Sequence, residues 1–222
     1  ANADSVAEMT VGLFLALERR IVEAHAKCLR SEFTTIAPKD FLGTEIMGKT
    51  FGQIGMGNIA QRIGHILSAG FGMTLLGYDP FISTEEAAKR GFRKVDTLEE
   101  LLEQSDLVNI NVPLVKSTEN MISGKLFDHF KPGAVFVNAA RGAVINEDGL
   151  YGALVSGKLK AACDTFVNEP PTAENKLLSL PNFIATPHLG GNTEESLRKA
   201  GTEVVEETLN VLAGKPPAHP VI

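Results

Sequence analysis

Apolar residues follow two alternating patterns along the chain. Short and nearly continuous apolar runs have the composition of buried strands, and between them apolar residues recur at helical spacing. The runs predict strands at 46–51, 74–78, 107–112, 134–138, 160–163 and 183–185. The intervening stretches predict helices at 59–70, 84–90, 98–104, 125–130 and 146–156. Strands that alternate with helices, without hairpin turns between them, indicate an α/β fold in which a doubly wound parallel sheet is covered on both faces.

Helical patterns also begin and end the chain. Ser5 and Glu8 have the spacing of a capping box, with Ser5 as the N-cap of a helix. An apolar face then predicts a long helix that runs to about Arg30 and is formed by Val6, Met9, Leu13, Leu17 and Ile21. A small domain does not need so long a helix to cover itself, so we expect it to bridge two bodies or to lie in the interface of a homodimer. The last amphipathic helix ends before Gly214.

Glycines mark the turn between the first predicted strand and the helix after it, in the pattern Gly55-x-Gly57-x-x-Ala60. Such a turn is typical of dinucleotide-binding sites, in which alanine is allowed at the third place. Gly55 permits the turn, Gly57 lets the backbone approach a pyrophosphate, and a small residue at position 60 lets the helix pack on the strand. The first amides of the helix would then point at the phosphates, assisted by the helix dipole.

An acid follows this turn at the distance that a dinucleotide site requires. Asp79 comes directly after the second predicted strand. A carboxylate there can accept hydrogen bonds from the adenosine ribose and would repel a 2′-phosphate, so it favours NAD over NADP. The alternative is that Asp79 and Pro80 form a turn with no ligand. Because the strand, turn, helix and acid occur in the right order, we expect an NAD site.

Composition narrows the class of protein and its partners. The chain has 222 residues, of which 44% are hydrophobic and 22% charged, as in ordinary globular proteins. A net charge of −6 argues against nucleic acid and anionic membranes as partners. Cys28 and Cys163 lie far apart without CxxC spacing, so neither a disulfide framework nor a metal site is expected. The chain contains no apolar run long enough to span a membrane, and we expect a reducing, cytoplasmic location.

Polar residues suited to catalysis follow three of the predicted strands. Arg141 comes after 134–138, Asp164 and Glu169 after 160–163, and His188 after 183–185. The carboxyl ends of parallel strands meet at one edge, where ligands bind. Arginine can hold a carboxylate, and histidine beside a carboxylate can exchange a proton near neutral pH. Taken singly, Arg141 could be a surface ion pair and His188 a structural residue. Together they suit hydride transfer to a 2-oxo acid.

In chain order, these motifs resemble the D-isomer-specific 2-hydroxyacid dehydrogenase family. The resemblance covers nearly the whole chain and implies a Rossmann-type NAD-binding domain. It rests on residues 5–8, 55–60, 79, 112–114, 138–142, 164–170 and 186–191.

The resemblance also implies a role for each site residue. Arg141 is similar to the arginine that binds the substrate carboxylate, His188 to the catalytic acid and base, and Glu169 to its carboxylate partner. Asp164 is similar to the acid that binds the nicotinamide carboxamide. The other cofactor-binding positions that it implies are Gly55, Gly57, Asn58, Ile59, Asp79, Val112, Pro113, Ala139 and Gly190. The implied reaction transfers a hydride between NAD(H) and a D-2-hydroxy acid or its 2-oxo acid.

The chain departs from this family at several points. The family commonly has arginine at Asn58 and glycine at Ala60, and either change should weaken pyrophosphate binding. Gln53 is polar inside an otherwise apolar strand. The family carries a substrate-binding half before the long helix, and we expect this half to be missing from the sequence given. We therefore expect residues 1–191 to form the NAD-binding domain, and 192–222 to form a return helix and the start of re-entry into the substrate-binding domain.

Two alternative functions stay open at this point. One is an NAD-sensing, corepressor-like regulator of the same fold. The other is a formate dehydrogenase, in which a glutamine typically accompanies the histidine, so Glu169 favours hydroxyacid chemistry. Among hydroxyacids, phosphoglycerate or glycerate is the first expectation. Since half of the substrate pocket is missing, we expect this chain to bind NADH but to turn over 2-oxo acids poorly.

Overall fold

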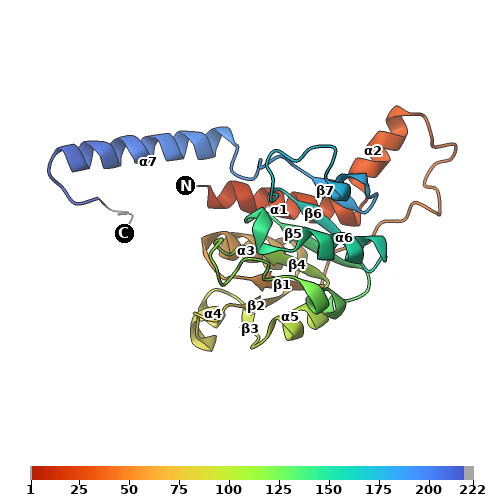
Figure 1. Ribbon diagram of the computed structural model, residues 1–222, viewed down its shortest axis with the longest axis horizontal. Helices are drawn as coiled ribbons and strands as arrows, with labels where there is room; N and C mark the ends of the chain where they lie inside the picture. The colour runs from red at the N-terminus through yellow and green to blue at the C-terminus, as the bar shows by residue number, and fades with distance from the viewer. Residues whose placement is uncertain (1, 218–222) are drawn as a thin grey trace.

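The protein is built around a parallel sheet, as predicted. The computed structural model describes residues 2–217, and within them a seven-stranded sheet has the order β3-β2-β1-β4-β5-β6-β7 (Figure 1). All neighbouring strands pair in parallel. The strands are β1 (Thr50–Ile54), β2 (Thr74–Tyr78), β3 (Arg93–Lys94), β4 (Leu107–Ile110), β5 (Ala134–Asn138), β6 (Leu159–Cys163) and β7 (Phe183–Ala185). The strand order reverses between β1 and β4, which places a crevice at their carboxyl ends.

Helices cover both faces of the sheet and create two hydrophobic cores. The α-helices are α1 (Ala3–Glu18), α2 (Ile21–Leu29), α3 (Asn58–Phe71), α4 (Thr84–Lys89), α5 (Leu98–Gln104), α6 (Glu147–Val155) and α7 (Glu194–Leu212). One core joins α1 and α3 to the sheet through Phe14, Phe51 and Ile63. The other joins α5 and α6 to the opposite face through residues such as Leu101 and Leu150. The doubly wound fold is thus confirmed.

The prediction of one helix reaching Arg30 is wrong, because the N-terminal helix is interrupted. Helix α1 ends at Glu18, and Arg20 has the left-handed φ of 53° before α2 begins. The Arg20 guanidinium donates to Glu23 Oε1 at 2.8 Å and to the Asp40 carbonyl at 3.1 Å. These contacts with α2 and with a distant loop accompany the bend. In Figure 1, α2 and the loop after it extend away from the sheet.

The start of α1 also differs from the prediction. The helix begins at Ala3 after Asn2, so Ser5 lies inside the first turn and does not cap it. The Ser5 hydroxyl instead contacts the Thr193 hydroxyl at 2.8 Å. Because Thr193 is the N-cap of α7, this contact joins the beginnings of two helices that are far apart in the sequence.

Other boundaries shift by a few residues. The first strand lies at 50–54 and not at 46–51, since Gly48 has a φ of 69° and turns the chain before it. The short strand β3 was not predicted, because its two residues are polar and carry no apolar pattern. The predicted helix at 125–130 is a 3₁₀ helix, Gly124–His129. The caps of α5 and α6 confirm the helix starts predicted there: Thr97 accepts from the Glu100 amide, and Asn146 from the Gly149 amide.

The final helix, α7, projects away from the sheet (Figure 1). Most of its large apolar side chains are more than half exposed, including Leu197, Val204 and Leu209 at 63%, 64% and 61%. The segment expected to re-enter a substrate-binding domain, residues 218–222, lies outside the described residues. No helix in the described part of the chain is long and apolar enough to cross a membrane.

Candidate active site

The glycine turn has the geometry that a phosphate-binding turn needs. Gly55 has a φ of 81°, and a Cβ atom there would lie 2.6 Å from the Asn111 carbonyl oxygen. Gly57 has no atom within 4 Å of the position that its Cβ would take, so the protein's own packing does not require glycine there. Gly57 is the N-cap of α3, and no side chain among the described residues caps this helix. The first amides of α3 are therefore available to an anion.

The two residues that complete the turn are both engaged by the protein. Ala60 is fully buried, so its methyl group fits where the helix meets the sheet. Asp79 accepts hydrogen bonds from the Met56 amide to Oδ2 and from the Phe81 amide to Oδ1, each at 3.0 Å. Asp79 thus fastens the end of β2 to the glycine turn. A carboxylate has about four acceptor positions, which leaves capacity for ribose hydroxyls.

A cleft of about 640 Å³ lies at the carboxyl edge of the sheet. It brings together eight of the predicted site residues: Ile59, Val112, Pro113, Ala139, Arg141, Asp164, His188 and Gly190. The lining does not include five others, which are Gly55, Gly57, Asn58, Asp79 and Glu169. Four of these belong to the turn and the end of β2, and Glu169 contacts His188 without itself lining the cleft. The volume is in the range of small-molecule and cofactor sites.

Sequence reasoning missed several residues of this cleft. Asn2 and Val6 enter it because α1 packs beside α3, a tertiary contact that no local pattern announces. Asn111 also lines it and follows β4 at the carboxyl edge, so the rule that identified Arg141 and His188 could have found it. The remaining unpredicted lining residues are Leu114, Ala140, Gly191 and Asn192.

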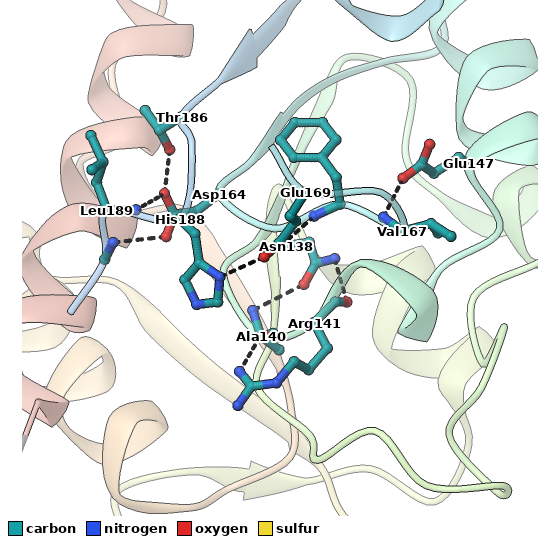
Figure 2. A network of polar contacts seen from close by, with 12 residues as sticks. Asn138, Ala140, Arg141, Glu147, Asp164, Val167, Glu169, Thr186, His188 and Leu189 are labelled. Carbon is teal, nitrogen blue, oxygen red and sulfur yellow. Dashed lines mark hydrogen bonds and ion pairs between the residues drawn. The ribbon is translucent and has the colours of Figure 1, made fainter. Parts of the chain in front are cut away.

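His188 and Glu169 form a hydrogen-bonded pair at this edge. His188 Nδ1 lies 2.8 Å from Glu169 Oε2, and the Phe166 amide donates to Glu169 Oε1 at 2.9 Å (Figure 2). Partial burial acts to raise the pKa of Glu169, but the hydrogen bonds from His188 and Phe166, with the nearby charges of His188 and Arg141, outweigh it and lower the pKa. With Nδ1 fixed on the carboxylate, the other ring nitrogen of His188 is left for a ligand in the cleft.

The backbone around His188 is held by Asp164. This carboxylate is only 1% exposed and accepts from the Thr186 hydroxyl and from the Leu189 and Gly190 amides, at 2.5, 2.8 and 2.8 Å (Figure 2). The carbonyl of Asp164 accepts from the His188 amide at 2.8 Å. His188 has a left-handed φ of 60°, a conformation that is uncommon for residues other than glycine. Asp164 therefore organises the loop that presents His188.

Arg141 is presented by a loop that packs closely on its neighbour. Asn138 accepts from the Ala140 amide and donates to the Arg141 carbonyl, each at 3.0 Å, and Arg141 Nη1 donates to the Ala140 carbonyl at 2.7 Å. A Cβ atom on Gly142 would lie 1.9 Å from the Phe166 carbonyl carbon. Only glycine allows this approach, which brings the loop of Arg141 against the loop of Glu169. Figure 2 shows the guanidinium on the same side of these loops as the imidazole.

The arrangement suits acid–base chemistry on an anionic ligand and does not suggest a metal centre. Among the described residues, no group of three or more His, Cys, Asp or Glu side chains could hold a metal ion. The cleft instead combines an arginine, a histidine paired with a carboxylate, and an uncapped helix N-terminus nearby.

Residues 11–190 match the model of the D-isomer specific 2-hydroxyacid dehydrogenase, NAD binding domain. The chain belongs to this family. The matched region contains the glycine turn, Asp79, Arg141, Asp164, Glu169 and His188. The fold and the family predicted from the sequence are therefore both confirmed.

The chain is also similar to individual dehydrogenases and reductases, both in sequence and in structure. The chain is 44% identical to D-3-phosphoglycerate dehydrogenase of Methanocaldococcus jannaschii over 216 residues, which are 97% of this chain and 40% of that protein. It is 41% identical to hydroxypyruvate reductase of Thermotoga maritima, over 96% of this chain and 68% of that protein. The crystal structure of D-lactate dehydrogenase with NAD⁺ from Lactobacillus jensenii superposes with a TM-score of 0.86 and 30% identity, covering 99% of this chain and 69% of that one.

Proposed function

We propose that this chain binds NAD(H) and supplies one half of the active site of an NAD-dependent D-2-hydroxyacid dehydrogenase. The observation that carries this proposal is the pair of His188 and Glu169, with Nδ1 and Oε2 2.8 Å apart, in a cleft shared with Arg141. An oriented histidine can exchange a proton with a substrate oxygen, and an arginine can hold the carboxylate beside it.

The residues at the turn fit a dinucleotide. The open side of Gly57 and the uncapped amides of Asn58 and Ile59 suit the pyrophosphate, and Asp79 suits the ribose hydroxyls. The backbone of Val112, Pro113 and Ala139 would line the rest of the cofactor, and Asp164 and Gly190 would lie beside the nicotinamide. The Asp79 carboxylate would repel a 2′-phosphate, so NAD is the preferred cofactor.

The cofactor, when bound, supplies or accepts the hydride. Arg141 binds the substrate carboxylate and stabilises the negative charge that develops on the neighbouring oxygen. In reduction, protonated His188 donates its proton from Nε2 to that oxygen, while Glu169 orients the ring through its contact with Nδ1. In oxidation, neutral His188 accepts the hydroxyl proton, and Glu169 stabilises the resulting charge.

The names of the relatives bear on the substrate. The chain spans 40% of the M. jannaschii protein, named as D-3-phosphoglycerate dehydrogenase, and 68% of the T. maritima protein, named as hydroxypyruvate reductase. We therefore propose a phosphoglycerate- or glycerate-type acid as substrate. The homodimer and the cytoplasmic location that we propose rest on the sequence and not on these names. A second domain would complete the substrate pocket, so this chain alone should turn over 2-oxo acids poorly.

The alternative functions make different use of the same residues. A regulator that only senses NAD needs no acid–base pair, and a formate dehydrogenase typically has glutamine beside its histidine. The contact between Glu169 and His188 favours hydroxyacid chemistry over both.

A binding titration tests the proposal. The chain contains no tryptophan, so NADH fluorescence can be followed with little protein background. We expect saturable binding of NADH and weaker binding of NADPH. Absence of saturable NADH binding would contradict the proposed function, and efficient turnover of 2-oxo acids by this chain would contradict the need for a second domain.

A further inference from the structure

Three amide side chains form a hydrogen-bonded row across β1 and β4, under the glycine turn. Gln53 and Asn109 are fully buried and face each other in the register of the two strands. Asn109 Nδ2 donates to Gln53 Oε1 at 3.0 Å and also to Asn111 Oδ1. The row explains why a polar residue occupies position 53 of an otherwise apolar strand.

The direction of this row is fixed by the backbone. Gln53 Nε2 donates to the carbonyls of Ile54 and Gly55 at 3.0 and 2.9 Å. Carbonyl oxygens only accept, so the nitrogen of Gln53 must face them and its oxygen must face Asn109. Asn109 must then present its nitrogen to Gln53. The second hydrogen on that nitrogen requires an oxygen from Asn111, so the amide nitrogen of Asn111 is directed away from the row.

That nitrogen lacks a partner in a place where a ligand is expected. Asn111 Nδ2 is a buried atom without a hydrogen-bond partner among the described residues, although Asn111 lines the cleft. The backbone N–H of Asn111 donates to the Ile54 carbonyl at 2.9 Å, and the backbone carbonyl of Asn111 lies against Gly55. A buried donor with no acceptor is unfavourable, and a bound acceptor would relieve this. Phosphate and ribose oxygens are such acceptors.

We propose that Asn111 Nδ2 donates a hydrogen bond to the pyrophosphate or the nicotinamide-side ribose of the dinucleotide. Gln53 and Asn109 act through it as positioning residues, because they hold Asn111 Oδ1 and so leave Nδ2 as the unpartnered end of this side chain. This inference rests on the proposed NAD site and adds a cofactor-binding side chain to it. It also gives β1 a second role. Gln53, which donates to the carbonyls of Ile54 and Gly55 in the turn, also helps to orient the Asn111 side chain.

The first test removes the donor and measures binding by calorimetry. Asn111→Asp retains an oxygen for Asn109, and Asn111→Ala removes the donor without adding a charge. We expect both to raise the Kd for NADH and for ADP-ribose by about tenfold or more, the usual weight of a hydrogen bond to a charged group. The Kd for AMP, which lacks the second phosphate and ribose, should not change. An unchanged NADH Kd in Asn111→Ala overturns the inference, and so does an equal loss for AMP.

A matched control separates this effect from a general loss of structure. Asn182 Nδ2 donates to the Leu154 and Leu159 carbonyls, each at 3.0 Å, and Asn182 does not line the cleft. Asn182→Asp should lower the Tm of the unbound chain and leave the NADH Kd unchanged. Failure of the unsubstituted chain to bind NADH would contradict the proposed function. Normal binding by the unsubstituted chain and by Asn111→Ala would contradict only the role of Asn111.

A double-mutant cycle tests the positioning role. Asn109→Leu leaves the bonds of Gln53 to the turn in place but removes the bond from Asn109 to Asn111 Oδ1, so that only the longer 3.5 Å contact from Gln53 Nε2 still orients the Asn111 side chain. We expect Asn109→Leu to raise the NADH Kd in the unsubstituted chain and to have no further effect in Asn111→Ala. An equal effect in both backgrounds would contradict positioning. Where Asn109→Leu does not fold, Asn109→Ala serves in the same cycle.

Discussion

The two ends of the proposed dinucleotide site are built in different ways. The glycine turn and the start of α3 come from one continuous segment, and their ligand-binding groups are backbone amides. The edge with Arg141 and His188 is assembled from three loops. Hydrogen bonds of Asp164 and Glu169 join two of them, and the close approach of Gly142 to Phe166 brings in the third. A local turn needs only glycines at the correct spacing, whereas the assembled edge depends on buried polar side chains that the chain must bring together.

The largest expected effect comes from removing the acid–base group. In an enzyme in which this chain supplies the NAD-binding half, His188→Ala should lower kcat/KM by about 10²–10⁴-fold, the usual contribution of general acid–base catalysis. NADH binding should change little, because the turn is separate. His129→Ala is a matched control, since His129 Nδ1 lies 2.7 Å from Glu103 Oε1 in a similar pair outside the cleft. Equal losses in both variants would contradict the assignment of His188.

Two glycines test whether the assembled edge depends on packing at Gly142, whereas the ligand-facing side of the turn at Gly57 does not. A Cβ at Gly142 would overlap the backbone of Phe166, so Gly142→Ala should lower the free energy of unfolding by about 1–3 kcal/mol, as overpacking does. Gly57→Ala should leave it unchanged, because that side of Gly57 is open. Denaturant unfolding measures both. A stability loss in Gly57→Ala as large as in Gly142→Ala would remove the distinction.

At the turn, the expected losses are in ligand affinity. Asp79→Ala should raise the NADH Kd by about tenfold, since it removes an acceptor for the ribose. It should also reduce the preference against NADPH, because the carboxylate no longer repels a 2′-phosphate. Parallel titrations with NADH and NADPH measure the ratio of the two affinities. An unchanged ratio would contradict the role of Asp79 in cofactor choice.

The smallest expected effect is on the pH dependence of stability. The pKa of Glu169 is lower in the folded chain than its ordinary value of 4.5, so its contribution is fully present above that value and is lost as the pH falls through the lower folded pKa. The Tm of the unsubstituted chain should therefore fall more steeply below pH 4.5 than that of Glu169→Gln. Parallel Tm curves would show that the pair adds no stability.

The sequence predicted local elements better than tertiary contacts. The caps at Thr97 and Asn146, and the strands β5 and β7, were predicted because their signals lie within a few neighbouring residues. Arg141 and His188 were identified as candidates because strand ends of a parallel sheet meet at one edge. The interruption of the N-terminal helix at Arg20 was not predicted, because it accompanies contacts with Asp40 and the ring of Phe41, far along the chain.

Some site features were not predictable for a further physical reason. The hydrogen bonds of Asp164 to the Leu189 and Gly190 amides depend on how two loops meet, which no residue pattern records. The same holds for the row of Gln53, Asn109 and Asn111, in which the strand register brings distant amides together. The polar Gln53 in an apolar strand indicated a special contact at this position but did not identify its partners.

At His188, the left-handed backbone makes the proposed catalytic role of the residue compete with the stability of its loop. A histidine with a φ of 60° holds a conformation that glycine or asparagine adopts more easily, so the backbone at this position is strained for the benefit of the imidazole. Selection for thermal tolerance alone would tend to replace the residue on which the proposed chemistry depends. A natural relative with glycine or asparagine at this position would have a less strained loop but no proton donor. Such a chain would be suited to binding a nucleotide without catalysing a reaction.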